Sequence, residues 1–240
     1  KGTKTGCREG DCGACTVMEG EFIHGHVSYK TILSCLTPIG KVHGRHIVTI
    51  EGLNGEALNP VQQAIVDHSA TQCGFCTPGF VVSLMTHCLS GDTSSLEKTL
   101  ASVDGNICRC TGYKSVERAA RQIWELNQSH LNMKPVEWMV SNHYLPSWFT
   151  EIPKRLAALD RDSRDVPDHA VIMGGGTDLM VQRADDLMVA GFNRPPAEVF
   201  DEIEINSGWC RVGGSVTVSE MLRSEKLKQY FPRLEDHFKL

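Results

Sequence analysis

Eight of the ten cysteines in this 240-residue chain fall into two sets of four with regular spacing. The first set places three thiols on one short loop and a fourth further along: Cys7, Cys12, Cys15 and Cys35. The second set consists of two close pairs: Cys73, Cys76, Cys108 and Cys110. Cysteine thiolates are preferred ligands of zinc and of iron–sulfur clusters. The sequence therefore predicts two metal-containing sites, each with four sulfur ligands.

The C-x4-C-x2-C…C spacing of the first set is typical of a plant-type [2Fe–2S] site. A cluster with four thiolate ligands is an anion that gains further negative charge on reduction. Gly6, Gly10 and Gly13 permit turns and close approach of the backbone, so that N–H groups can point at the sulfurs. The alternatives are two disulfides or a structural zinc. Zinc ligands usually come in two pairs, however, and no extracellular signal favours disulfides.

The C-x2-C…C-x-C spacing of the second set is compatible with zinc as well as with a second cluster. Each cysteine pair precedes a predicted helix. The partial positive charge and free N–H groups of a helix N-terminus favour an anionic centre. Next to the first site a second cluster is the favoured interpretation, because two neighbouring clusters would conduct electrons.

The motifs GCREGDCGACTV, QCGFCTPG and NICRCTGY, in this order, resemble the iron–sulfur region of the xanthine dehydrogenase family of molybdenum hydroxylases. The resemblance implies an α+β multidomain chain. It would comprise a β-grasp plant-type ferredoxin domain whose N-terminal strands are missing, a four-helix [2Fe–2S] domain, a linker, and the N-terminal part of an α/β FAD-binding domain. The expected boundaries are 1–55, 56–127, 128–146 and 147–240.

A glycine turn at Gly174–Asp178 follows a predicted strand over 170–173. By itself it is either a tight connection or a phosphate site made of backbone N–H groups. AVIMGGGTDLMV and RVGGSVTVSEML resemble stretches of the family's flavin domain. The resemblance implies FAD contacts from eight residues, while the family's other FAD contacts fall outside this sequence: Ile172, Met173, Gly174, Gly175, Gly176, Thr177, Asp178 and Leu179.

The resemblance implies an electron-transfer subunit with no catalytic residue of its own. Electrons would pass from the molybdopterin cofactor of a large partner subunit through the Cys73 set and the Cys7 set to FAD, and then to NAD or another acceptor. Gln72 matches the family glutamine that hydrogen-bonds the pterin. Xanthine or hypoxanthine is the leading substrate. The alternatives are an aldehyde, nicotinate or carbon monoxide hydroxylase, or a non-catalytic module stabilised by metal.

Local patterns predict the elements that hold these residues. Asn59-Pro60 and Thr77-Pro78 are expected to start helices, and Ser94 with Glu97 is expected to form a capping box. The expected helices cover 61–68, 80–89, 96–103, 115–127 and 220–227. The expected strands are at 16–18, 45–50 and 170–173, with a hairpin over 203–206 and 209–212.

The net charge and the hydropathy of the chain exclude some classes of binding partner. A net charge of −5 argues against duplex nucleic acid, which requires a basic surface. No apolar stretch approaches the roughly 18 residues of a membrane helix, so a soluble protein is expected. Cluster thiolates suit a reducing compartment, which favours the cytoplasm. The resemblance implies a hetero-oligomer with the large subunit. Cys88 and Cys210 are interpreted as buried core thiols.

Overall fold

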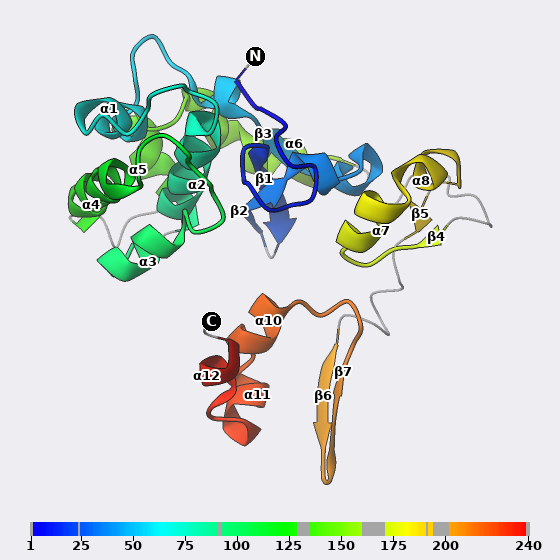
Figure 1. Cartoon of the computed structure of the whole chain (residues 1–240). Coiled ribbons are helices and arrows are strands. Elements are labelled where there is room, and N and C mark those ends of the chain that lie inside the picture. Colours follow the sequence, from blue (N-terminus) through cyan, green and yellow to red (C-terminus); the bar gives the residue numbers. More distant parts are fainter. Residues whose placement is uncertain are drawn as a thin grey trace. The chain divides into compact units, whose positions relative to one another are not determined.

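The computed structural model describes residues 2–23, 25–90, 93–128, 135–159, 171–190, 192–193 and 202–238 (Figure 1). By contacts, the chain divides into two compact units, Lys1–Arg164 and Asp165–Leu240. The first unit contains both predicted cluster-bearing domains and the predicted linker. Within the described residues, no helix is long and apolar enough to cross a membrane.

A three-stranded antiparallel sheet forms one side of the first unit. Its strands are β1 (Thr16–Ile23), β2 (His26–Leu33) and β3 (His46–Val48), in the order β2-β1-β3. The strand expected over 45–50 is shorter, because the chain turns there into a 3-10 helix, η3 (Ile50–Leu53). Two further 3-10 helices lie between β2 and β3: η1 (Ser34–Leu36) and η2 (Ile39–Val42).

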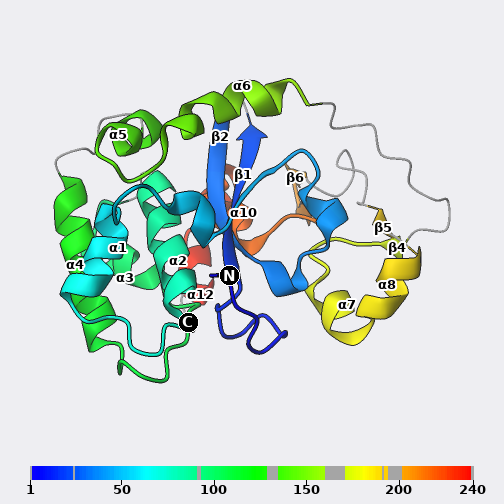
Figure 2. The same ribbon diagram turned by 90° about the horizontal axis from the view of Figure 1, so that it is seen from above.

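Four helices follow η3 in this unit: α1 (Pro60–Asp67), α2 (Thr77–Ser90), α3 (Leu96–Ala101) and α4 (Lys114–Asn127). Their existence and order confirm the predicted helical segment. Figures 1 and 2 show α2 next to β1 and β2, with the other three helices on its far side, and α2 contacts both strands. The sheet and the helices therefore share one core, in which α2 is the central element.

The predicted capping is confirmed at Asn59 and is wrong at Ser94. The Asn59 side chain accepts a hydrogen bond from the Gln62 amide, and the Gln62 side chain returns one to the Asn59 amide. Helix α2 begins at Thr77, as predicted. The prediction of Ser94 as the cap of α3 is wrong. Ser95, which has an extended backbone, is the capping residue, and its hydroxyl accepts from the Lys98 amide at 3.2 Å.

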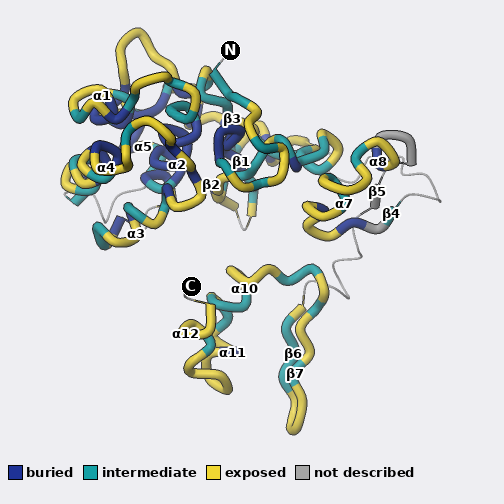
Figure 3. The backbone as a smooth tube through the Cα atoms, viewed as in Figure 1, coloured by how far each residue is buried: buried dark blue, intermediate teal, exposed yellow. Residues whose placement is uncertain are grey.

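Helix α2 and the inner face of α4, drawn dark blue in Figure 3, contribute more residues to the core of the first unit than any other helix or strand. The four residues predicted for that face are all buried: Val116, Ala119, Ala120 and Ile123. Cys88 is also buried, and its sulfur accepts a hydrogen bond from the Asn127 side chain at 3.6 Å. The interpretation of Cys88 as a core thiol is therefore confirmed.

The segment predicted as a linker contains a helix and packs on the first unit. Pro135 begins α5 (Pro135–Ser141), and the chain continues through η5 (Ser147–Glu151) into α6 (Ile152–Ala157). Trp138 and Tyr144 are buried, with ring centroids 5.1 Å apart. Helix α5 contacts α2, and α6 contacts β1 and β2. Apolar anchors thus hold this stretch against the core although its flanking residues are polar.

The second unit consists of small, mostly exposed elements (Figure 3). The predicted hairpin is confirmed as β6 (Ile203–Asn206) paired with β7 (Trp209–Val212). Cys210 on β7 is only half-buried, so its interpretation as a core thiol is wrong. The remaining elements are β4 (Val171–Ile172), α7 (Thr177–Gln182), α8 (Ala184–Ala190), β5 (Phe192–Asn193), α10 (Val218–Arg223), α11 (Glu225–Tyr230) and α12 (Leu234–Phe238).

The prediction of one helix over 220–227 is wrong. Ser224 leaves the helical conformation with ψ 108° and divides the segment into α10 and α11. Its hydroxyl accepts a hydrogen bond from the Leu227 amide at 3.3 Å and so caps the second helix. Serine competes well for backbone N–H groups, which explains why an apolar helical pattern is interrupted here.

Candidate metal centres

The loop before β1 carries the first three cysteines, and the β1–β2 hairpin brings the fourth to them. Thr16 lies opposite Leu33 in this hairpin, so the residues flanking the pair are close. Ser34 donates to the Cys15 carbonyl from both its amide, at 3.2 Å, and its hydroxyl, at 2.8 Å. Cys35 follows in η1. The predicted first set is therefore assembled by one loop and one hairpin.

Backbone N–H groups surround the sulfur of Cys7. The amides of Glu9, Asp11 and Cys12 each donate to Cys7 Sγ at 3.4 Å. These donors lower the pKa of the Cys7 thiol to about 6, which favours the thiolate that a metal requires. The turn that aims them passes through Gly10 at φ 83°. The prediction that backbone amides point at the sulfurs of this loop is confirmed for Cys7.

Glycine serves two different purposes in this loop. Gly10 and Gly13 adopt positive φ, as the turn requires. Gly6 has an ordinary φ but lies so close to Cys12 that an added Cβ would be 2.9 Å from its sulfur. The close approach of backbone and thiols is what the sequence predicts for an anionic cluster site.

The first set forms two adjacent pairs of thiols. The Cys7 amide donates to Cys12 Sγ at 3.5 Å, and the side chains of Cys7 and Cys12 hydrogen-bond each other. Cys15 and Cys35 are the other pair. Burial, and then the hydrogen bond with Cys15, raises the pKa of Cys35 to about 11.

The second set also forms two pairs, but each joins residues that are far apart in sequence. Cys110 and Cys73 lie with their sulfurs 3.5 Å apart, and both are exposed. Cys76, directly before α2, hydrogen-bonds Cys108. Burial, followed by that contact, raises the pKa of Cys76 to about 12. The residues around α2 and α4 therefore bring together all four predicted cysteines.

The thiols of each set occur as two neighbouring pairs. Among the residues that the structure describes, no group of three or more Cys, His, Asp or Glu could hold a metal ion. A [2Fe–2S] cluster instead takes two protein ligands on each of its two irons. Two neighbouring thiol pairs at each site are compatible with that requirement.

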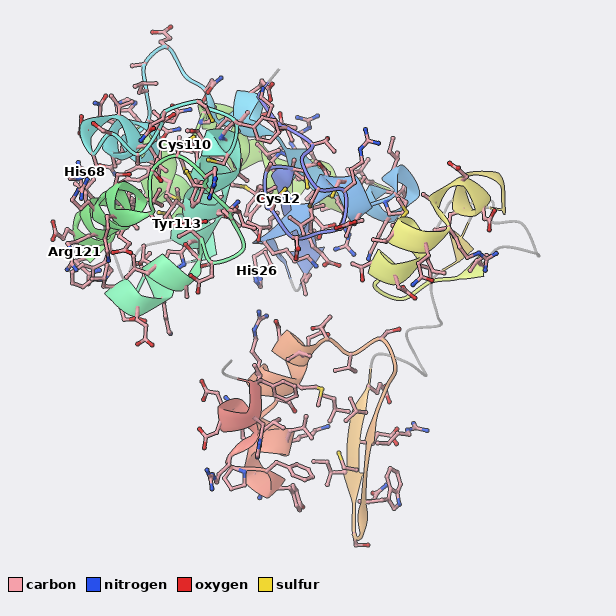
Figure 4. The ribbon with its side chains drawn as sticks, in the orientation of Figure 1. Cys12, His26, His68, Cys110, Tyr113 and Arg121 are labelled. Atoms are coloured by element: carbon pink, nitrogen blue, oxygen red, sulfur yellow. The ribbon has the colours of Figure 1, made fainter. Side chains whose placement is uncertain are left out.

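The two sites are joined by direct hydrogen bonds between their loops. The Ile107 amide donates to the Cys12 carbonyl at 3.0 Å. The side chain of Asn106 donates to the Gly13 carbonyl at the same distance. Figure 4 shows Cys12 on the loop before β1, and Cys110 with Tyr113 on the segment before α4. Cys12 of the first set is thus hydrogen-bonded to Ile107, the residue directly before Cys108 of the second set.

Two residues of this region were not singled out by the sequence reasoning. Asn106 is buried and belongs to the junction just described. Tyr113 has a left-handed backbone with φ 68°, and its hydroxyl accepts from the Cys108 amide at 3.1 Å. Both belong to the NICRCTGY motif, so their position beside the ligands was the signal that could have found them.

The glycine turn has the predicted location between β4 and α7. Gly176 has φ 80° and precedes α7, and its carbonyl accepts from the Met180 amide at 2.9 Å. An added Cβ at Gly176 would clash with the Met173 side chain, which is buried. Met173 therefore supports the turn from inside. Gly174, Gly175, Thr177 and Asp178 are exposed, while Leu179 is half-buried.

Gln72 is exposed immediately before the exposed Cys73. This placement leaves its amide at the surface, beside the second set of thiols. The apolar side chains exposed around the same thiols are Phe75, Ile107 and Tyr113.

Comparisons with known proteins agree with the cysteine chemistry. A family model described as "[2Fe-2S] binding domain" matches residues 49–121. Aldehyde oxidase 3 of Rattus norvegicus is 43% identical over 124 residues, which are 50% of this chain and 9% of the relative. Xanthine dehydrogenase of Blastobotrys adeninivorans is 45% identical over 124 residues, with the same coverage. The chain thus spans about a tenth of the length of these curated relatives.

A solved structure, quinoline 2-oxidoreductase from Pseudomonas putida 86, matches 54% of this chain and 77% of that chain. The sequences are 34% identical, and the TM-score is 0.45. The curated relatives that match this chain are named aldehyde oxidase and xanthine dehydrogenase. Through its amino-terminal half, this chain is therefore similar to the iron–sulfur part of aldehyde oxidases and xanthine dehydrogenases, enzymes of the molybdenum hydroxylase type.

Proposed function

We propose that this chain is the electron-transfer part of a molybdenum hydroxylase. Each set of four cysteines would hold one [2Fe–2S] cluster, and these clusters, when bound, carry single electrons. The observation that carries the proposal is the junction of the two paired-thiol loops, in which the Ile107 amide donates to the Cys12 carbonyl. Two separate metal modules would not need ligand loops that hydrogen-bond each other.

The protein residues would bind the clusters and adjust their potentials. Three amides donate to Cys7 Sγ, while the hydroxyl and amide of Thr111 donate to Cys108 Sγ at 3.0 and 3.4 Å. Hydrogen bonds to sulfur stabilise the more negative reduced state and raise the potential. The two ligand sets therefore give this chain separate control over each cluster.

The exposed face around Cys73 and Cys110 would contact the molybdopterin-binding large subunit. Apolar side chains are exposed beside these thiols, among them Phe75 at 45% and Ile107 at 52%. Exposed apolar residues around a redox site are typical of a surface that a partner covers. Gln72 would hydrogen-bond the pterin there. The second set would lie nearest the molybdenum, and the first set would follow toward the flavin.

The second unit would contribute to FAD binding. The exposed backbone at Gly174 and Gly175 can approach a pyrophosphate closely, because an added Cβ at either position meets nothing within 4 Å. In the assembled enzyme, residues 1–55 and 56–127 would be the cluster domains and 128–146 the connection. Residues 147–240 would be part of the flavin domain. The acceptor beyond FAD would be NAD or a similar molecule.

We propose xanthine or hypoxanthine as the substrate of the assembled cytoplasmic enzyme, with an aldehyde as the second candidate. Both names occur among the relatives at similar identity. The choice depends on the large subunit, because the residues described here would transfer electrons without touching the substrate.

Iron, acid-labile sulfide and zinc analysis combined with electron paramagnetic resonance tests the proposal. We expect about four irons and four sulfides per chain and two distinct [2Fe–2S] signals after reduction with dithionite. Zinc without sulfide would overturn it and favour a metal-stabilised interaction module. Purification from the native source should also yield a molybdenum-containing large subunit, and the substrate that bleaches the clusters identifies the reaction.

A further inference from the structure

The junction between the two thiol sites is centred on one buried amide side chain. Asn106 is 5% exposed and lies between α3 and the Cys108 ligand. None of the expected cofactors uses it as a ligand. Buried polar groups are costly unless their hydrogen bonds are satisfied, so the partners of Asn106 indicate its role.

Asn106 hydrogen-bonds three different segments. Its Nδ2 donates to the Gly13 carbonyl at 3.0 Å and lies 3.4 Å from the Thr16 hydroxyl. Its Oδ1 accepts from the Ser83 hydroxyl at 2.7 Å. The first cysteine loop, strand β1 and helix α2 are thereby held together by one side chain. The contact to Gly13 joins residues that are 93 positions apart in sequence.

Glycines on both sides of Asn106 allow the three segments to touch. An added Cβ at Gly13 would clash with the Gly105 carbonyl. An added Cβ at Gly79 would clash with the Gly13 carbonyl and lie 2.9 Å from Asn106 Nδ2. The backbones of the Cys12–Cys15 loop and of α2 are therefore at their closest possible approach. A side chain that bridges such a contact determines the spacing of what lies on either side.

The neighbours of this contact are the ligands themselves. Gly13 follows Cys12 directly, and Asn106 precedes Cys108 by two residues. Ile107 lies between Asn106 and Cys108 in the sequence, and its amide donates to the Cys12 carbonyl. A shift of the Asn106 side chain would therefore move Cys12 relative to Cys108. No cysteine needs to be substituted for this to happen.

We propose that Asn106 is a positioning residue that sets the separation, and hence the electronic coupling, of the two cluster sites. This inference rests on the proposed function, because it requires both clusters. Magnetic interaction and electron exchange between two centres both fall steeply with distance. A residue that fixes the spacing would consequently control how fast electrons leave the second site.

The test is Asn106→Asp, which keeps the size of the side chain and its acceptor for Ser83 but removes both N–H donors. The carboxylate would then face the Gly13 carbonyl without a proton between them. We expect both [2Fe–2S] signals to remain, with loss of the magnetic splitting between them in the fully reduced protein. Amide exchange at Ile107 should become about tenfold faster, as expected when a local hydrogen bond is lost.

Asn127→Asp is the matched control. Asn127 is also 5% exposed, and its Nδ2 donates to the Ile123 carbonyl at 2.7 Å, away from both thiol sets. This variant should show the general cost of a buried amide-to-acid change without altering the splitting. If it alters the splitting as much as Asn106→Asp does, the effect is not positional and the inference is overturned.

Ser83→Ala provides a milder variant if Asn106→Asp does not fold. It removes only the hydrogen bond to Asn106 Oδ1, so we expect a smaller reduction of the same splitting. An unchanged splitting in whichever of these variants folds would overturn the inference and leave the proposed function intact. Absence of two cluster signals in the unmodified protein would instead overturn the proposed function, and the inference with it.

Discussion

The two thiol sites lie in the same compact unit but are held in different ways. In the first, the Cys7/Cys12 pair comes from one loop, and three backbone amides donate to a single sulfur. In the second, the Cys73/Cys110 pair joins residues 37 positions apart, and both thiols are exposed. The first site is therefore mainly a local structure, whereas the second depends on how the helices pack.

This difference assigns different tasks to the two sites. Amide donors and partial burial protect the first site and stabilise negative charge there. Exposure of Cys73 and Cys110 leaves the second site accessible to the large subunit of the proposed enzyme, and less protected than the first site. The second site should consequently be the one that responds to changes in helix packing, and the first should respond to changes in its own loop.

Removal of one cysteine from each site should have the largest effect and tests whether the two sites are separate. Cys15→Ala should abolish the first cluster and Cys76→Ala the second, because a [2Fe–2S] cluster requires four protein ligands. Iron per chain should fall from about four to about two in each variant. Metal analysis and paramagnetic resonance would show which signal is lost.

Cys88→Ala is the control for these variants, since Cys88 is buried in the core away from both sets. It should retain both clusters. Loss of both signals in Cys15→Ala and in Cys76→Ala alike would contradict the separation of the two sites. Full iron content in either variant would show that the ligand assignment is wrong.

The close packing of α2 against the first cysteine loop can be tested at Gly79. Alanine normally stabilises a helix relative to glycine by about 0.5–1 kcal/mol. At Gly79, however, an added Cβ would clash with the Gly13 carbonyl. We expect Gly79→Ala to lower the free energy of unfolding by about 1–3 kcal/mol, as overpacking usually does. Thermal unfolding monitored by circular dichroism would measure the change.

The matched variant is Gly105→Ala, because an added Cβ there meets nothing within 4 Å. Its unfolding should change by no more than about 0.5 kcal/mol. A Gly79→Ala protein as stable as Gly105→Ala would contradict the close approach of α2 to the first loop.

Thiol reactivity in the metal-free protein distinguishes the two sites by pH. The pKa of Cys7 is lowered to about 6 and that of Cys76 is raised to about 12, so at pH 7.5 Cys7 is mostly thiolate and Cys76 is thiol. Iodoacetamide should therefore modify Cys7 more than about tenfold faster. Labelling of Cys7 should slow as the pH falls through 6. Mass spectrometry of the labelled peptides measures both rates, and equal rates would contradict the prediction.

The ionisation of Cys7 also affects stability in that protein. Folding lowers its pKa from 9.0 to about 6, so the folded state is favoured most above pH 9. This contribution is lost as the pH falls through 6.

Local features were predictable from the sequence, and long-range ones were not. The cap at Asn59 and the buried face of α4 depend on neighbours three or four residues away. The pairing of Cys73 with Cys110 and the contact of Asn106 with Gly13 depend on how α2 meets the sheet. No local pattern encodes such a contact, so the sequence could predict which cysteines form a site but not which of them are adjacent.

The errors have the same origin. Serines at 94 and 95 are equally good caps locally, but it is the hydroxyl of Ser95 that accepts from the Lys98 amide. The apolar spacing over 220–227 predicts one helix, but the hydroxyl of Ser224 takes the Leu227 amide and starts a new one. In each case a side chain competed for a backbone group, which periodicity does not reveal.

The smallest expected effect concerns Cys108, the buried thiol of the second site. Burial opposes its ionisation, but the hydroxyl and amide of Thr111 donate to its sulfur and the net pKa is lowered. Thr111→Val removes the hydroxyl donor without changing the shape of the side chain. One such bond contributes about 0.5–1.5 kcal/mol, or ~20–60 mV for a one-electron couple.

We therefore expect Thr111→Val to lower the potential of the second cluster by that amount, because the reduced state loses a donor to sulfur. The potential of the first cluster should not change. Among the described residues, Cys108 is the one thiol to which Thr111 donates a hydrogen bond. Thr77→Val is the control, because the Thr77 hydroxyl pairs with that of Thr71 at 2.8 Å beside the same site. A redox titration followed by paramagnetic resonance resolves both clusters. Equal shifts in the two clusters would show that the sites are tuned together, and their separate control by different loops would then be incorrect.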